Sequence, residues 1–115
     1  MGTSRQPQGT LVQGTLDMLI LARLARGPEH GFGIAEDVKR RSDEVLRIEE
    51  GSLYPALQRL ETQGLISSSW GISDNNRRAR FYELTPRGRK QLGVEVSTWR
   101  RVASAIDRVI DPEVA

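Results

Sequence analysis

Apolar residues recur every three or four positions over most of this chain, which is the spacing of helices that bury one face. Residues 11–26 are the most apolar such segment, and their main stripe consists of Leu16, Leu19, Ile20 and Leu24. Arg23 and Arg26 are expected on the more solvent-exposed side of this helix. A second side is apolar as well, through Leu11, Met18, Leu21 and Ala22. Because a small domain cannot easily cover both sides of one helix, this segment favours contact with a partner chain.

A second helix is predicted over residues 33–42, with Ile34, Ala35 and Val38 facing inward. Its C-terminal end is basic, through Lys39-Arg40-Arg41. These positive charges complement the helix dipole, and we prefer this explanation for them to contact with DNA. Residues 43–50 predict an acidic connection anchored by Leu46 and Ile48. The carboxylates of Glu49 and Glu50 precede the next helix, so stabilisation of its N-terminus explains them better than acid–base chemistry.

A short amphipathic helix is predicted over residues 52–63, with one apolar face formed by Leu53, Ala56, Leu57 and Leu60. Ser52 is a suitable N-cap, which would put Pro55 at the third helical position, where no intrahelical N–H bond is lost. Gly64 is suited to end the helix. The opposite face is polar and carries Tyr54. Taken alone, this pattern fits an ordinary capped surface helix better than a DNA-reading helix.

A β-hairpin is predicted directly after this helix, with strands over residues 65–70 and 80–84 and a polar turn over residues 71–76. Arg77, Arg78 and Arg80 lie where the turn re-enters the second strand, and guanidinium groups suit phosphate oxygens. A solvated charged loop is the alternative. Because the cluster follows a capped helix at a short distance, the combination favours a winged helix-turn-helix, a mainly α fold with a small β-hairpin.

The last predicted helix runs from Thr85-Pro86, a cap followed by a proline, to about Ile110. Its apolar residues follow a heptad spacing: Leu92, Val96, Trp99, Ala103, Ile106 and Ile110. This helix could pack back on its own domain, but a seam along its whole length favours dimerisation with a second copy. Trp99 lies in the middle of the seam, where packing is the usual role of an indole and a wall of a ligand pocket is the alternative.

The composition and charge of the chain exclude several classes of function. The formal net charge is +2 and the sequence pI is about 9.5, so any basic surface must be local. Without cysteine there is no disulfide or thiolate site, and the single histidine, His30, is better explained by capping or surface duty than by metal binding. Nothing resembles a catalytic site, so no enzyme activity, cofactor or metal is expected. With no apolar run of membrane-spanning length and no visible secretory signal, a soluble cytoplasmic protein without a membrane partner is expected.

The motifs resemble those of the PadR family of bacterial transcriptional regulators. The resemblance covers residues 11–110 and rests on GTLDMLILARL, HGFGIAEDV, EEGSLYPALQRLETQGLI and RRARFYELTPRGRKQL. The single C-terminal helix and the SSSWG and STWRRV runs look like the short, multidrug-sensing subfamily. The expected organisation is a flexible segment over residues 1–10, a winged helix-turn-helix over 11–85 and a dimerisation helix over 86–115.

The resemblance implies a homodimeric repressor that binds palindromic double-stranded DNA and is relieved by a planar aromatic effector. The candidate DNA-binding residues are Ser52, Tyr54, Pro55, Gln58, Arg59, Asn76, Arg77, Arg78 and Arg80. The candidate ligand-binding residues are Met18, Val96, Trp99 and Ala103. This sequence departs from the multidrug-sensing members at Ala103, where an acidic residue would help to hold a cationic drug, and Asp17 lies nearby on the first helix. The alternative function is a winged-helix module for protein–protein assembly without DNA binding, which would have no need for the wing arginines.

Overall fold

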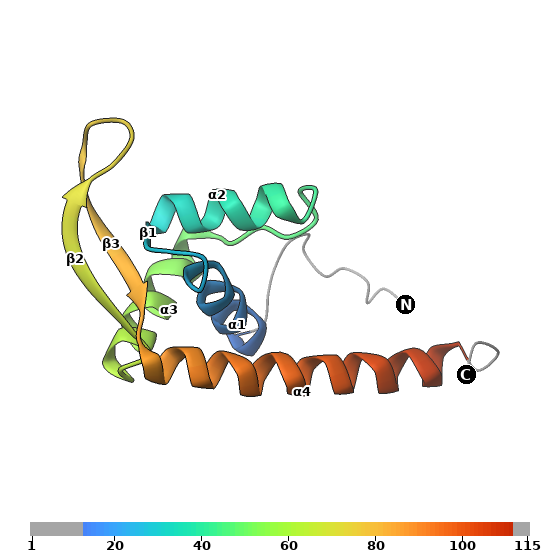
Figure 1. Cartoon of the computed structure of the whole chain (residues 1–115). Coiled ribbons are helices and arrows are strands. Elements are labelled where there is room, and N and C mark those ends of the chain that lie inside the picture. Colours follow the sequence, from blue (N-terminus) through green and yellow to red (C-terminus); the bar gives the residue numbers. More distant parts are fainter. Residues whose placement is uncertain (1–12, 112–115) are drawn as a thin grey trace.

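The computed structural model describes residues 13–111, which form four helices and a three-stranded antiparallel sheet (Figure 1). The segment 1–10, expected to be flexible, lies outside the described residues. The mainly helical prediction with a small hairpin is confirmed. In chain order the elements are α1 (Gln13–Leu24), β1 (Glu29–His30), α2 (Gly31–Arg41), α3 (Glu50–Thr62), β2 (Ile66–Ile72), β3 (Arg78–Leu84) and α4 (Pro86–Ile110).

The hydrophobic core lies between α1, α2, α3 and the base of the hairpin. Its fully buried side chains are Ile20, Leu21, Leu24, Ile34, Leu53, Leu57, Leu60 and Ile66. Each buried leucine or isoleucine stabilises the fold by about 1.5–3 kcal/mol relative to an exposed position. Leu21 was assigned from the sequence to a second apolar side of α1, but the chain's own core covers it completely. Met18 and Ala22 on that side remain half-buried.

The sheet has one strand more than the predicted hairpin. The two residues of β1 pair antiparallel with β3, Glu29 opposite Tyr82 and His30 opposite Phe81. Such a short strand leaves no periodic signal in a sequence, because only its pairing with β3 defines it. The hairpin strands are also longer than predicted, which shortens the connecting loop to residues 73–77.

The start of α3 differs from its prediction. The helix begins at Glu50 with Glu49 as N-cap, not at Ser52, and the cap makes no side-chain hydrogen bond. The amide of Leu53 already donates to the Glu49 carbonyl at 2.9 Å, so Pro55 lies inside the helix and interrupts its bonding there. The acidic Glu50 in the first turn complements the helix dipole and permits the earlier start. Gly64 ends α3 as predicted, with a φ of +77°.

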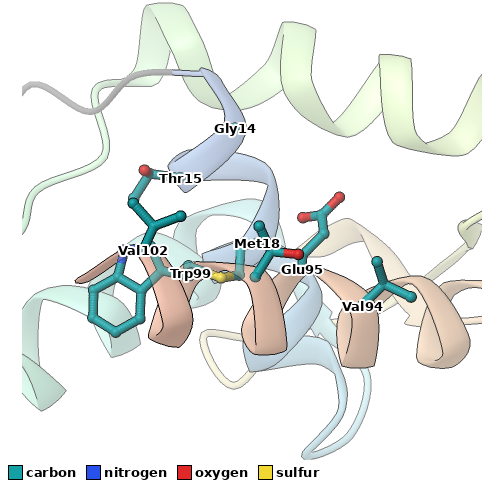
Figure 2. Close-up of a pocket in the computed structure, with 8 residues that line it drawn as sticks. Gly14, Thr15, Met18, Val94, Glu95, Trp99 and Val102 are labelled. Atoms are coloured by element: carbon teal, nitrogen blue, oxygen red, sulfur yellow. The ribbon is translucent and has the colours of Figure 1, made fainter. Parts of the chain in front are cut away.

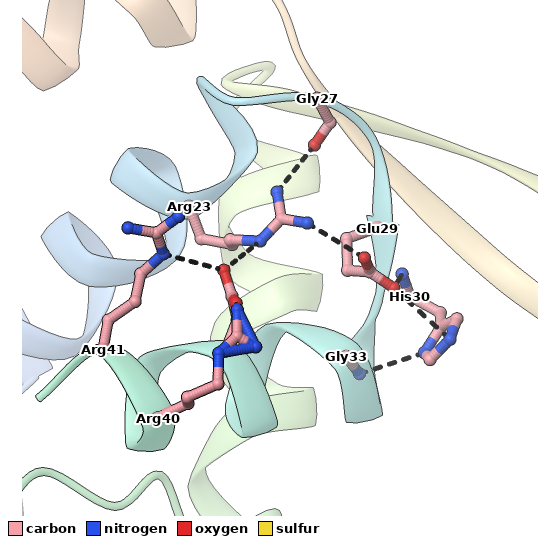
Figure 3. A network of polar contacts seen from close by, with 8 residues as sticks. Arg23, Gly27, Glu29, His30, Gly33, Arg40 and Arg41 are labelled. Carbon is pink, nitrogen blue, oxygen red and sulfur yellow. Dashed lines mark hydrogen bonds and ion pairs between the residues drawn. The ribbon is translucent and has the colours of Figure 1, made fainter. Parts of the chain in front are cut away.

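Arg23 lies in a polar network between α1 and α2 (Figure 3). The prediction that it lies on a solvent-exposed side of α1 is therefore wrong. Its Nε lies 2.7 Å from Asp37 Oδ2, and its Nη2 donates to Glu29 Oε1 at 2.9 Å. Asp37 also forms ion pairs with Arg40 and Arg41. These two arginines therefore neutralise the Asp37 carboxylate in addition to complementing the dipole of α2. The buried Asp37 carboxylate requires such partners, and the packing of α2 on α1 adds Arg23 to the two that its own helix provides.

His30 caps α2, which confirms the capping role expected from the sequence. Its Nδ1 accepts a hydrogen bond from the Gly33 amide at 3.0 Å. The ring also meets Phe81 of β3 edge-on, with 5.2 Å between the ring centroids. The imidazole therefore joins the start of α2, where Figure 3 shows its hydrogen bond with Gly33, to Phe81 of the sheet.

The helix α4 starts against the end of α3 and then leaves the rest of the chain (Figure 1). Thr85 Oγ1 accepts from the Gly88 amide at 3.0 Å and donates to the Gly64 carbonyl at 2.8 Å. A Cβ at Gly88 would lie 2.0 Å from the Leu65 carbonyl oxygen, so only glycine allows this approach. The direction of α4 is thus fixed at its first turn. No helix among the described residues is long and apolar enough to cross a membrane.

The second half of α4 carries a row of apolar side chains that the other described residues leave about half exposed or more, which we call the exposed stripe. Its members, with their exposed fractions, are Trp99 (51%), Val102 (48%), Ile106 (51%), Val109 (77%) and Ile110 (71%). In the first half of the helix, Leu92 packs against the core. The alternative that α4 packs back on its own domain therefore holds for its first half only.

Candidate nucleic-acid interface

The outer face of α3 is exposed as the amphipathic pattern requires. Ser52, Tyr54, Pro55 and Gln58 are all exposed, whereas the apolar face lies in the core. Arg59 is different, because its Nη2 lies 2.5 Å from Asp17 Oδ1 on α1. Arg59 therefore joins α3 to α1, and it remains one of the predicted DNA-binding residues of this helix.

The outer face of α3 and the hairpin share one hollow of about 400 Å³, lined by Tyr54, Gln58, Glu61, Thr62, Arg80 and Tyr82. Tyr82 lies on its floor and is 7% exposed. Burial raises the pKa of the Tyr82 hydroxyl above its ordinary value of 10.0, the charge of Arg80 opposes this shift, and Glu61 adds to it. The hydroxyl therefore remains a neutral donor at physiological pH.

Trp70 organises the arginines of the hairpin. The guanidinium carbon of Arg78 lies 4.5 Å from the centroid of the indole, and that of Arg80 lies 5.5 Å from it. Arg80 Nε also donates to Ser68 Oγ at 3.0 Å, and Ser68 donates to Glu61 Oε2 at 2.7 Å. Cation–π contacts and this chain of hydrogen bonds limit the motion of the charged groups, which lowers the entropy lost on binding an anion.

The tip of the hairpin places Asn76 and Arg77 at the surface. Asn76 adopts a φ of +60°, and its amide donates to the Ser73 carbonyl at 2.8 Å, which closes the turn. Arg77 and Arg78 are both exposed. In the part of the chain that the structure describes, no carboxylate lies within ion-pair distance of either one. The hairpin therefore presents two positive charges that the described residues do not neutralise with a carboxylate.

Gly31, at the first position of α2, supports the ring of Tyr54. A Cβ at this glycine would lie 2.8 Å from both Cε1 and the hydroxyl oxygen of Tyr54. The missing side chain lets the ring rest on the start of α2 while Tyr54 stays 44% exposed. Sequence reasoning gave Gly31 no role, because the contact joins residues that are far apart in the chain.

A second hollow, of about 380 Å³, lies between α1 and α4 (Figure 2). It brings together two of the predicted ligand-binding residues, Met18 and Trp99. The structure does not place Val96 or Ala103 in its lining. The other lining residues are Gly14, Thr15, Val94, Glu95, Thr98 and Val102. Asp17 was the acidic residue expected near a ligand, but its carboxylate is paired with Arg59. Glu95 is the acidic residue that lines the hollow, and sequence reasoning did not single it out.

Comparison with known proteins agrees with this architecture. A family model described as the transcriptional regulator PadR-like family matches residues 20–94. The chain is 37% identical over 73 residues to transcriptional regulator Rv3488 of Mycobacterium tuberculosis, and the match covers 64% of both chains.

Solved structures show the same fold. A transcriptional regulator from Clostridium thermocellum superposes with a TM-score of 0.75 at 31% identity, covering 84% of this chain and 90% of that one. A PadR family regulator from Clostridium difficile superposes with a TM-score of 0.72 at 29% identity, covering 83% and 97%. The predicted winged helix fold is thereby confirmed, and the chain belongs to the PadR-like family of transcriptional regulators, which are not enzymes.

Proposed function

We propose that this protein is a homodimeric repressor that binds a palindromic site in double-stranded DNA. In this proposal α3 enters the major groove and the β2–β3 hairpin, the wing, follows the neighbouring phosphates. The observation that best supports this proposal is the hollow shared by α3 and the wing. Tyr54 and Gln58 of α3 line it together with Arg80 of the wing. A groove-reading helix and a phosphate-binding wing must act on one side of the molecule, and this hollow connects them.

The proposed DNA contacts are of two chemical kinds, contacts to base edges and contacts to phosphates. Gln58 has an amide that can hydrogen-bond to base edges, and Ser52, Tyr54 and Pro55 lie on the same exposed face. Arg77, Arg78 and Asn76 on the wing suit phosphate oxygens, which fix position without reading sequence. Arg80 is held between the two sets by Trp70 and Ser68.

The direct test is a mobility-shift assay on DNA from upstream of the gene that encodes the protein. We expect a specific shift whose affinity falls steeply as salt rises, because phosphate contacts release counterions. A scrambled duplex of the same length is the control. If the folded dimer gives no shift at low salt, DNA binding is wrong and a module for protein–protein assembly becomes the better explanation.

Gly31→Ala should weaken specific DNA binding although residue 31 contacts no DNA in this proposal. The added methyl group meets the Tyr54 ring and displaces it from the start of α2. We expect a drop in affinity similar to that of Tyr54→Ala, measured by fluorescence anisotropy on the same duplex. Gly51→Ala is the control, because nothing lies within 4 Å of a Cβ there. Equal affinity of the Gly31→Ala variant and the wild type would contradict the supporting role of Gly31.

The exposed stripe of α4 supports the homodimer. Five large apolar side chains on one side of a helix are costly in water, and a second copy is the occupant that their heptad-like spacing fits. A two-fold dimer would present two α3 helices to successive turns of the major groove, roughly 34–36 Å apart.

The hollow beside Trp99 supports an effector site in the same dimer. Trp99 and Met18 offer flat and adaptable apolar surfaces, and both line the hollow. We propose that a planar aromatic molecule binds there and relieves repression. It can do so only if it prefers a dimer geometry in which the two α3 helices no longer match the DNA, because a ligand that binds both geometries equally shifts neither.

Trp99→Leu should weaken binding of a planar aromatic dye, because leucine keeps the stripe apolar but removes the flat stacking face. A ring between two symmetry-related indoles makes two stacking contacts, together about 1–3 kcal/mol, so we expect about a 5- to 150-fold loss of affinity. Quenching of Trp99 fluorescence in a Trp70→Phe background is the measurement for the parent protein, and calorimetry compares the variant. If a broad panel of flat aromatics neither quenches Trp99 nor binds, the hollow has no effector role.

A further inference from the structure

The hollow between α3 and the wing contains a hydroxyl group that the described residues leave unpaired. Tyr82 lies on the floor of this hollow and is 7% exposed. Its hydroxyl makes no hydrogen bond with another described residue, and the oxygen stays accessible from the hollow. Burial raises the pKa of this hydroxyl, so it keeps its proton. An unpaired donor at such a position is suited to bind an acceptor from outside the chain.

The rest of the lining offers further hydrogen-bond donors. They are the side chains of Tyr54, Gln58 and Thr62 on α3 and of Arg80 on β3. Tyrosine, glutamine, threonine and arginine side chains all donate to phosphate oxygens in protein–DNA complexes. Arg80 is already oriented, because its Nε donates to Ser68 Oγ at 3.0 Å. Its two terminal nitrogens make no hydrogen bond with the described residues, so they remain available to an anion.

The proposed docking mode brings a DNA strand across this hollow. With α3 in the major groove and the wing along the neighbouring phosphates, one sugar–phosphate strand must pass between them. The hairpin stands beside α3 (Figure 1), and the hollow lies between the two. A phosphate of that strand therefore faces the donors of the hollow.

We propose that this hollow is a binding site for one backbone phosphate in each half-site, whose oxygens accept hydrogen bonds from the Tyr82 hydroxyl and the Arg80 guanidinium. Tyr82 is then a further DNA-binding residue, and sequence reasoning gave it no such role. This inference rests on the proposed DNA binding and assigns one particular phosphate to one place on the protein.

Glu61 opposes phosphate binding from within the same hollow. Its Oε2 accepts a hydrogen bond from Ser68 Oγ at 2.7 Å and lies 3.9 Å from Arg80 Nη2. Its negative charge and the positive charge of Arg80 largely offset each other for a phosphate in the hollow. The site therefore holds its phosphate through directed hydrogen bonds more than through net charge. Changes at Tyr82 and at Glu61 should consequently have opposite effects on DNA binding.

Fluorescence anisotropy with the full-length protein tests this site on the upstream duplex that gives the specific shift. Each phosphate of the duplex is replaced in turn by an uncharged methylphosphonate. Tyr82→Phe should bind the natural duplex at least about tenfold more weakly than the wild type, because it lacks a hydrogen bond to a charged group. At one phosphate of each half-site, the methylphosphonate should weaken binding of the wild type and leave binding of Tyr82→Phe almost unchanged. Thermal unfolding of Tyr82→Phe should match that of the wild type, since the hydroxyl has no partner to lose among the described residues.

Glu61→Gln keeps the size of the side chain and removes its charge. This variant should bind the natural duplex more tightly than the wild type, and the gain should disappear when the same phosphate is a methylphosphonate. Glu83→Gln is the matched control, because it removes the same charge from an exposed position on the opposite face of β3, outside the hollow. Any change of affinity in Glu83→Gln should be the same with and without the methylphosphonate at that position.

The outcomes separate this inference from the proposed function on which it rests. If the wild type and Tyr82→Phe respond alike to a methylphosphonate at every position, Tyr82 contacts no phosphate, and the inference is wrong while DNA binding stands. If the gain of Glu61→Gln persists at the phosphate to which Tyr82 responds, the two residues do not share one phosphate, and the site is overturned. If the wild type binds no upstream duplex at low salt, DNA binding itself fails and the phosphate site fails with it.

Discussion

Replacing Arg77 and Arg78 together by alanine should flatten the salt dependence of DNA binding. Both side chains are exposed on the wing, and no carboxylate of the described residues pairs with them. If each contacts one phosphate, a dimer loses four contacts. At about 0.9 per contact, the slope of log affinity against log salt then falls by about 3.6. Between roughly 50 and 200 mM salt the wild type should lose about 150-fold more affinity than the variant does.

The measurement is the dissociation constant from fluorescence anisotropy at four or more salt concentrations. Arg100→Ala with Arg101→Ala is the matched control, because it removes two neighbouring exposed arginines from α4, away from the wing. The control should keep the wild-type slope. A wing variant whose slope equals that of the wild type would show that the hairpin does not contact phosphates.

Ile106→Asp should dissociate the dimer and remove palindrome-specific DNA binding. Ile106 lies in the middle of the exposed stripe, where a second copy would enclose it. A carboxylate there would be buried without a partner in each protomer, at a cost of several kcal/mol. A monomer can occupy only one half-site, so it loses the joint binding of two linked sites.

Sedimentation equilibrium at micromolar concentration gives the oligomeric state directly. Ser104→Asp is the matched control, because residue 104 is exposed on the opposite side of α4 from Ile106. It adds the same charge and should leave a dimer. A monomeric wild type, or a dimeric Ile106→Asp variant with intact DNA binding, would contradict the role of the stripe.

The geometry of the proposed dimer depends on the first turn of α4. Gly88 packs directly on the Leu65 backbone, and Thr85 ties that turn to the end of α3. The proposed recognition helix α3 and the proposed dimerisation helix α4 are therefore in contact through the first turn of α4. A small rotation of α4 in a ligand-bound dimer would be carried directly to α3, which gives the proposed effector a physical route to the DNA-binding surface.

Several residues show where local reasoning was sufficient. The apolar face of α3, with Leu53 and Leu57 fully buried, follows from its spacing alone. Gly64 at the end of α3 and Thr85-Pro86 at the start of α4 follow from capping chemistry, which involves only near neighbours. The turn of the hairpin was found for the same reason, although its strands proved longer than predicted.

Other residues were assigned wrongly or missed because their partners are distant in the sequence. Arg23 was placed on a wet side, yet it pairs with Asp37 on another helix. Arg59 was predicted at the DNA, and sequence reasoning missed that it also meets Asp17, 42 residues earlier in the chain. The short strand β1 exists only through its pairing with β3. No periodic pattern records such pairs.

The sequence by itself determined the helices, the hairpin and the apolar row of α4, because these depend on the spacing of residues within one segment. Only the tertiary structure decided which charges are neutralised inside the chain and which are left to act outside it. Arg59 and Asp17 neutralise each other, whereas Arg77, Arg78 and Glu95 have no opposite charge beside them among the described residues. The reason is that electrostatic attraction depends on distance in space, and the packing of α1 on α3 and α4 sets those distances.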